Sequence, residues 1–138
     1  MLREGRSMVG SQLRFWALLS EGGATVPESQ LVPDVVWYNA ECAWSSDERF
    51  DGVAVNNEAY DRYWTEAEKS AYLDNLYAIK REAARQDAAL GILDAHYSVG
   101  WLWGKDDNLQ DIYVTWNGVN QPIMRHFVDI FDSVDVQV

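Results

Sequence analysis

The sequence predicts a single α/β domain in which short apolar strands alternate with helices. Apolar, strand-like runs recur near residues 14–19, 51–57, 90–98 and 134–138, and an amphipathic helical pattern separates the second run from the third. A helix between two strands returns the chain to the same end of the sheet, so we expect the strands to be parallel. With 138 residues, the chain has room for about four such β/α units in one domain.

The first segments are read from their apolar runs and from the residues that break them. Residues 13–19 are typical of a buried strand, and Gly22, Gly23 and Pro27 then mark a loop. Residues 34–44 are also apolar and fit a helix, but their valines and aromatic residues suit a strand as well. Both interpretations stay open for that segment.

The second strand, residues 51–57, has two distinct faces. Side chains alternate along a strand, so Val53 and Val55 share the face that packs under helices. The other face carries small residues and then polar groups toward the carboxyl end: Gly52, Ala54, Asn56 and Glu58. In a barrel of parallel strands, catalytic groups sit at that end.

The clearest helix follows this strand. Thr65 and Glu68 have the spacing of a capping box, in which each residue satisfies an exposed amide group of the other. Apolar residues then recur at helical spacing and predict one buried stripe, formed by Tyr72, Leu76, Ile79 and Ala83.

The third strand, residues 90–99, also presents two different faces. Asp94, His96 and Ser98 share the polar face, and their apolar neighbours would meet the helices. We expect the polar face to point into the same mouth as Glu58, at the carboxyl ends of the strands.

The last third of the chain predicts a strand, a turn and a helix. Residues 111–116 are strand-like, Asn117 and Gly118 signal a turn, and Pro122 suits the first turn of a helix. The apolar face of that helix is expected to be Ile123, Phe127, Ile130 and Phe131. His126 is expected on its solvated face.

Charge and composition exclude several function classes. The formal net charge is −11, so the chain is unsuited to nucleic-acid backbones and to anionic membrane surfaces. No segment reaches the roughly 20 apolar residues of a membrane span. Cys42 is the only cysteine and there are two histidines, so we expect no internal disulfide, no metal site and no cofactor.

One motif resembles a known family. Asp51, Gly52, Ala54, Asn56 and Glu58 stand in the register of the Asp-Gly-x-Asp-x-Asp-x-Glu motif of chitinase-like family 18 glycoside hydrolases. That motif lies on the fourth strand of a TIM barrel, and its final Glu is the proton donor. The resemblance implies that Glu58 is a general acid acting on a glycan that contains N-acetylglucosamine.

A second signature of that family stands in the expected order. Ser20-Glu21-Gly22-Gly23 matches the Ser-x-Gly-Gly that ends the third strand of the family barrel. A full eight-stranded barrel needs roughly 250 residues. The resemblance therefore implies that residues 1–138 form a partial (β/α)8 TIM barrel, about strands 3 to 6, whose open edges favour self-association.

The departures from the family motif concern its chemistry. Ala54 and Asn56 replace the two middle aspartates. In the family, the aspartate before the Glu holds the acetamido group that acts as nucleophile, and Asn56 lacks its negative charge. We therefore expect weak or absent hydrolysis by the isolated chain.

The candidate site gathers the polar strand ends and the aromatic residues near them. Glu58 and Asp94 are the candidate catalytic carboxylates. The candidate substrate-binding residues are Asn56, Asn57, His96, Trp101, Trp103 and Trp116. The tryptophans are included because aromatic faces stack on sugar rings, whereas Trp16 and Trp37 are assigned to the core.

Three hypotheses follow. The chain is a glycosidase-like barrel segment with Glu58 as acid. Alternatively, it is another barrel glycosidase, in which Asn57-Glu58 resembles the Asn-Glu pair that ends the fourth strand of many retaining enzymes and Asp94 substitutes for the nucleophile of a later strand. The third hypothesis is a non-catalytic carbohydrate-binding or self-associating α/β domain. In each case we expect carbohydrate or a second copy as partner, with no nucleic acid and no membrane.

Overall fold

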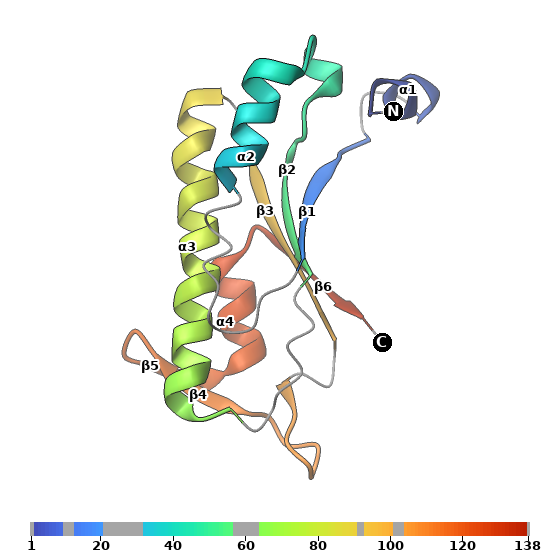
Figure 1. The fold of residues 1–138 in the computed structure, drawn as a ribbon. Coiled ribbons are helices and arrows are strands. Elements are labelled where there is room, and N and C mark those ends of the chain that lie inside the picture. Colours follow the sequence, from blue (N-terminus) through green and yellow to red (C-terminus); the bar gives the residue numbers. More distant parts are fainter. Residues whose placement is uncertain are drawn as a thin grey trace.

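The computed structural model describes residues 2–9, 13–20, 32–56, 64–90, 93–100 and 104–137. Its centre is a four-stranded, all-parallel sheet with the strand order β1-β2-β3-β6 (Figure 1). The strands are β1 (Trp16–Ser20), β2 (Gly52–Asn56), β3 (Asp94–Gly100) and β6 (Ser133–Gln137). The predicted α/β class and the parallel arrangement of the four strands are confirmed.

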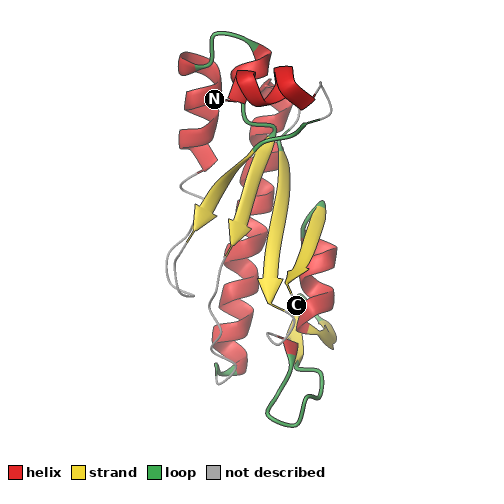
Figure 2. Ribbon diagram, turned by 90° about the vertical axis from the view of Figure 1, so that its right-hand side faces the viewer, coloured by secondary structure: helices red, strands yellow, loops and turns green. Residues whose placement is uncertain are grey.

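The main helices cover one face of this sheet. They are α2 (Val32–Trp37), α3 (Glu66–Leu90) and α4 (Ile123–Ile130), and α1 (Leu2–Val9) lies near the start of β1 (Figures 1 and 2). Crossovers between parallel strands are right-handed in nearly all proteins, so strands that follow chain order carry their helices on the same side. The opposite face of the sheet is left without a covering helix among the described segments.

The core lies between the sheet and these helices. Val53 and Val55 are fully buried there, as their alternation predicts, and Ala95, Tyr97 and Val99 of β3 join them. Leu73, Leu76 and Ile79 of α3 are buried in the same apolar cluster. Tyr72 and Tyr97 share a buried hydrogen bond of 2.6 Å between their hydroxyl groups, which links α3 to β3.

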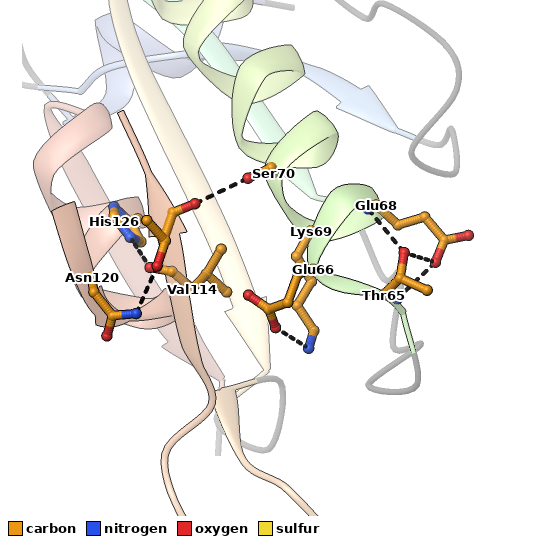
Figure 3. Close-up of polar contacts among 9 residues, drawn as sticks. Thr65, Glu66, Glu68, Lys69, Ser70, Val114, Asn120 and His126 are labelled. Carbon is orange, nitrogen blue, oxygen red and sulfur yellow. Dashed lines mark hydrogen bonds and ion pairs between the residues drawn. The ribbon is translucent and has the colours of Figure 1, made fainter. Parts of the chain in front are cut away.

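The capping box of α3 is confirmed (Figure 3). The Thr65 amide donates to Glu68 Oε2 at 2.7 Å, and the Glu68 amide donates to Thr65 Oγ1 at 3.2 Å. The Thr65 hydroxyl also donates to Glu68, and these bonds hold the pKa of the Glu68 carboxyl below its ordinary value. The predicted apolar stripe of this helix is buried in full: Tyr72, Leu76, Ile79 and Ala83.

The third strand begins later than predicted. Residues 83–90 contain several alanines and other strong helix formers, so α3 continues to Leu90 and β3 begins only at Asp94. The prediction of a strand from residue 90 was therefore wrong by four residues.

The ambiguous segment 34–44 is helical. It contains most of α2 and the π-helical turn Tyr38–Cys42. Buried Asn39 donates from Nδ2 to the Phe50 carbonyl at 2.9 Å and accepts the Phe50 amide hydrogen at 2.8 Å. This paired contact fixes the chain just before it enters β2.

A hairpin that the sequence indicated only in part precedes α4. Strands β4 (Tyr113–Trp116) and β5 (Val119–Pro122) are antiparallel, and Asn117 and Gly118 both have positive φ, at 49° and 78°. Two consecutive left-handed residues of type Asn-Gly are the signature of a type I′ turn. The turn was predicted, but β5 was not, because its polar residues and Pro122 read as a loop before a helix.

The prediction that His126 lies on a solvated helix face is wrong. The side chain is buried because the β4–β5 hairpin folds against α4 (Figure 3). His126 Nε2 donates to the Val114 carbonyl at 3.0 Å, and Nδ1 accepts from the Gln121 side-chain amide at 3.1 Å. The four apolar residues predicted for the buried face of this helix are all in the core. No helix in the described ranges is long and apolar enough to cross a membrane.

Asp132 joins three elements and gives a test of the fold. Its carboxylate accepts the Ala95 amide hydrogen of β3 at 2.9 Å and forms an ion pair with Lys80 of α3, directly before β6 begins. Burial raises the pKa of this carboxyl, but the bonds from Ala95 and Lys80 outweigh burial and hold the pKa below its ordinary value.

We expect Asp132→Asn to lower the free energy of unfolding by about 1 kcal/mol at neutral pH, because the group is partly exposed. Because the folded-state pKa is lower than the unfolded value of about 3.9, the ionised carboxylate stabilises the fold at pH values above about 3.9. This contribution is lost as the pH falls through the folded-state pKa. Urea unfolding at several pH values should therefore show the wild-type advantage shrinking in acid. Asp34→Asn, on the exposed side of α2, is the control. Equal stability of the two variants at neutral pH would contradict the role of Asp132.

Candidate functional site

The uncovered face of the sheet collects most of the polar strand residues. Alternation places the even-numbered residues of β1, β2 and β3 on this face, together with the odd-numbered residues of β6. We call it the open face, and it is formed by Trp16, Leu18, Gly52, Ala54, Asn56, Asp94, His96, Ser98, Ser133 and Asp135. Trp16 was assigned to the core, but it is 36% exposed here; Trp37, assigned likewise, is 61% exposed on α2.

Trp16 lies across the open face because the neighbouring strand carries almost no side chain. A Cβ added at Gly52 would lie 2.7 Å from Trp16 Cδ1 and 2.2 Å from the Asp94 carbonyl oxygen. The indole reaches past β2 to His96 on β3, with 5.8 Å between the ring centroids and 36° between the ring planes. Only glycine at position 52 leaves room for this contact, and Ala54 beside it is also small.

His96 joins β3 to the edge strand β6 through both ring nitrogens. Nδ1 lies 2.7 Å from Ser133 Oγ, and Nε2 lies 3.1 Å from Asp135 Oδ2. In the register of the two strands, His96 is opposite Ser133 and Ser98 is opposite Asp135, so His96 is flanked by two residues on the same face of β6. The His96 side chain is only 16% exposed, whereas that of Asp135 is 72% exposed.

Asp94 does not lie where the sequence interpretation placed it. It is the first residue of β3 and is opposite Gly52, the first residue of β2, so it lies at the amino end of the sheet. Four residues of strand, about 13 Å, separate it from the level of Asn56 and Ser98. It also forms an ion pair with Arg14. The predicted convergence of Asp94 on a mouth at the carboxyl ends is therefore wrong, and the late start of β3 is the reason.

Asn56 occupies the position that the alternation predicts. It ends β2 on the open face, is half-buried, and lies between Ser20 of β1 and Ser98 of β3 in the register. The remaining candidates Glu58, Asn57, Trp101 and Trp103 lie outside the described residues, so their roles stay predictions.

Trp116 lies with the helices and not on the open face. Its Nε1 donates to Asp74 Oδ1 of α3 at 2.8 Å, and its ring packs edge-on against Tyr77 and His126 at centroid distances of 5.7 Å and 5.5 Å. These contacts give Trp116 a packing role that attaches the hairpin to α3. The structure does not bring it together with His96.

Sequence reasoning missed four residues of the open face: Trp16, Leu18, Ser133 and Asp135. The signal for the last two was present, since valines alternate with polar residues from 133 to 137. What the sequence could not supply was that β6 lies next to β3. Among the described residues, no group of three or more His, Cys, Asp or Glu side chains is placed to hold a metal ion.

Comparisons with protein-family models, curated proteins and solved structures find no match to this chain. The resemblance to chitinase-like enzymes therefore rests on the residues of the motif alone.

Proposed function

We propose that this chain is a carbohydrate-binding segment of a glycoside hydrolase-like (β/α) barrel, with the open face of the sheet as its ligand side. The observation that carries the proposal is the position of Trp16 beside the polar chain of His96, Ser133 and Asp135. A sugar ring has an apolar C–H face and a rim of hydroxyl groups. A flat aromatic ring next to donors and acceptors complements both.

The arrangement of strands and helices supports the barrel part of the proposal. Parallel sheets normally have both faces covered, either by helices on each side or by closure into a barrel. Here the strands follow chain order and α2, α3 and α4 share one face, which is the arrangement within a sector of a (β/α)8 barrel. In a barrel, the open face would line the interior, and its carboxyl end, at Asn56 and Ser98, would lie at the mouth where ligands bind.

The motif resemblance supports Glu58 as an acid that follows the carboxyl end of β2, whereas Trp16 is opposite Gly52 at the amino end of the sheet. Asn56, two residues before Glu58 in the sequence, has no charge with which to keep a neighbouring carboxyl protonated or to stabilise a cationic intermediate. Asp94 at the opposite end of the sheet is paired with Arg14 and does not compensate. We therefore propose binding without efficient turnover.

Titration with a chito-oligosaccharide, followed by tryptophan fluorescence, tests this function. We expect Trp16→Ala to weaken binding at least tenfold, because the stacking surface is lost. Trp44→Ala is the matched control and should leave binding unchanged, since Trp44 is 95% exposed and lies outside the strands of the sheet. A fluorogenic N-acetylglucosaminide should give the same low rate with wild type and Glu58→Gln. Equal affinities of the two tryptophan variants would contradict the binding site, and turnover that Glu58→Gln abolishes would contradict the inactive assignment.

A second candidate function is self-association through the open face and the sheet edges. Within the described part of the chain, β1 and β6 each pair on one side only, and Leu18 of β1 is 62% exposed on the open face. Unpaired strand edges and exposed apolar side chains are features of interfaces between chains. A second copy of this chain would pair β6 with β1 and cover both open faces.

Size-exclusion chromatography with light scattering measures this association. We expect a species of twice the chain mass of 15.8 kDa, and Leu18→Lys should shift it toward the monomer because a charge would be buried in the interface. Val128→Lys, on the exposed side of α4, is the control. A wild-type monomer at all concentrations would exclude this candidate.

A further inference from the structure

Ser133, His96 and Asp135 form one continuous hydrogen-bonded chain on the open face. Both ring nitrogens of His96 are engaged, at 2.7 Å from Ser133 Oγ and at 3.1 Å from Asp135 Oδ2. An ionised carboxylate only accepts hydrogen bonds, so the proton of the neutral ring belongs on Nε2. Nδ1 then carries the lone pair and accepts the hydrogen of the Ser133 hydroxyl.

This is the order of groups that activates a serine. A hydroxyl is a weak nucleophile until an adjacent base takes its proton, and a carboxylate on the far side of the base fixes the tautomer of the ring. In serine proteases Nε2 faces the serine and Nδ1 faces the aspartate, and here the two nitrogens exchange places. The exchange leaves the chemistry unchanged, because in neutral imidazole either nitrogen can accept a proton when the other carries the hydrogen.

The surroundings of this chain suit a reaction at Ser133. Trp16 lies beside the His96 ring, whose side chain is only 16% exposed, while Ser133 itself is exposed. The Asp132 amide donates to the Ala95 carbonyl of β3 at 3.0 Å. Successive amides of a strand point to opposite sides of it. The Ser133 amide hydrogen therefore points away from β3, at the outer edge and next to its own hydroxyl. An amide in that place donates to the oxyanion of an acyl-transfer intermediate.

We propose that Ser133 is a nucleophile toward carboxylic esters, with His96 as its general base and Asp135 as a positioning residue. Ser133 Oγ attacks the ester carbonyl carbon while its proton moves to His96 Nδ1. The tetrahedral intermediate collapses, the bond from carbon to the leaving oxygen breaks, and His96 returns the proton to that oxygen as the alcohol departs. Water then attacks the acyl carbon as His96 takes its proton, the bond to Ser133 Oγ breaks, and His96 returns the proton to Ser133 Oγ as the carboxylic acid leaves. The proposal does not rest on carbohydrate binding, although both use the same residues of the open face.

A fluorophosphonate probe tests the nucleophile directly on the wild-type chain. Attack by Ser133 forms an oxygen–phosphorus bond and expels fluoride, so intact-mass spectrometry should show one adduct and peptide mapping should place it on Ser133. No adduct, or an adduct spread over several serines, would overturn the proposal without need of any variant. Hydrolysis of p-nitrophenyl acetate should fall at least tenfold after the probe has reacted.

Variants separate activation from simple exposure. We expect His96→Gln to slow labelling at least tenfold, and Ser70→Ala to leave it unchanged, because the Ser70 hydroxyl donates only to the Thr115 carbonyl of β4. Asp135→Asn should slow labelling and Asp135→Glu should restore it in part, which a merely structural role would not require. Thermal unfolding of each variant confirms that it is folded. Labelling of Ser133 at the wild-type rate in folded His96→Gln would overturn the assignment of the base.

Discussion

Helices α2, α3 and α4 all cover the same face of the four-stranded parallel sheet. Because they all lie on one side, the other face of the sheet has no helix packed against it among the described residues. The sheet strands follow chain order, with the β4–β5 hairpin inserted between β3 and β6. Because crossovers between parallel strands are normally right-handed, this order brings α2, α3 and α4 to the same side. The valines and aromatic residues of β2 and β3 are used in the core on that side. The small and polar residues of the same strands are left on the open face.

The open face is organised by contacts between strands rather than within them. Gly52 of β2 has no side chain between Trp16 of β1 and His96 of β3, so the indole can lie across β2 and reach His96. His96 in turn links β3 to Ser133 and Asp135 on β6. The proposed sugar binding and the proposed attack by Ser133 both use this assembly of an aromatic ring and a hydrogen-bonded polar chain.

Much of the fold could be predicted from local patterns. The alternation in β2, the capping box of α3 and the Asn117-Gly118 turn each involve residues close together in sequence, and each stands as predicted. Alternation also separates polar from apolar positions on β3, whichever residue begins the strand. Local signals therefore sufficed for the elements and for the faces of single strands.

The positions along the sheet and the cross-strand contacts could not be predicted in the same way. Asp94 was placed at the wrong end because the alanine-rich end of α3 gives no strong stop signal, so the first residue of β3 was misjudged. The hydrogen bonds of His96 depend on which strand lies beside β3, and the partner residues on that strand are 37 positions further along the chain. His126 is buried only because the hairpin folds over it, which no pattern within α4 reveals.

The contact between Trp16 and His96 is the most direct measure of whether the open face is assembled as described. Two-dimensional nuclear Overhauser spectroscopy of the wild-type chain and of Gly52→Ala resolves it. Because the ring centroids lie 5.8 Å apart, the account predicts cross-peaks between the indole protons of Trp16 and the imidazole protons of His96 in wild type. A Cβ at position 52 would clash with the indole, so these cross-peaks should be lost in Gly52→Ala. Their absence from wild type, or their persistence unchanged in Gly52→Ala, would contradict the account.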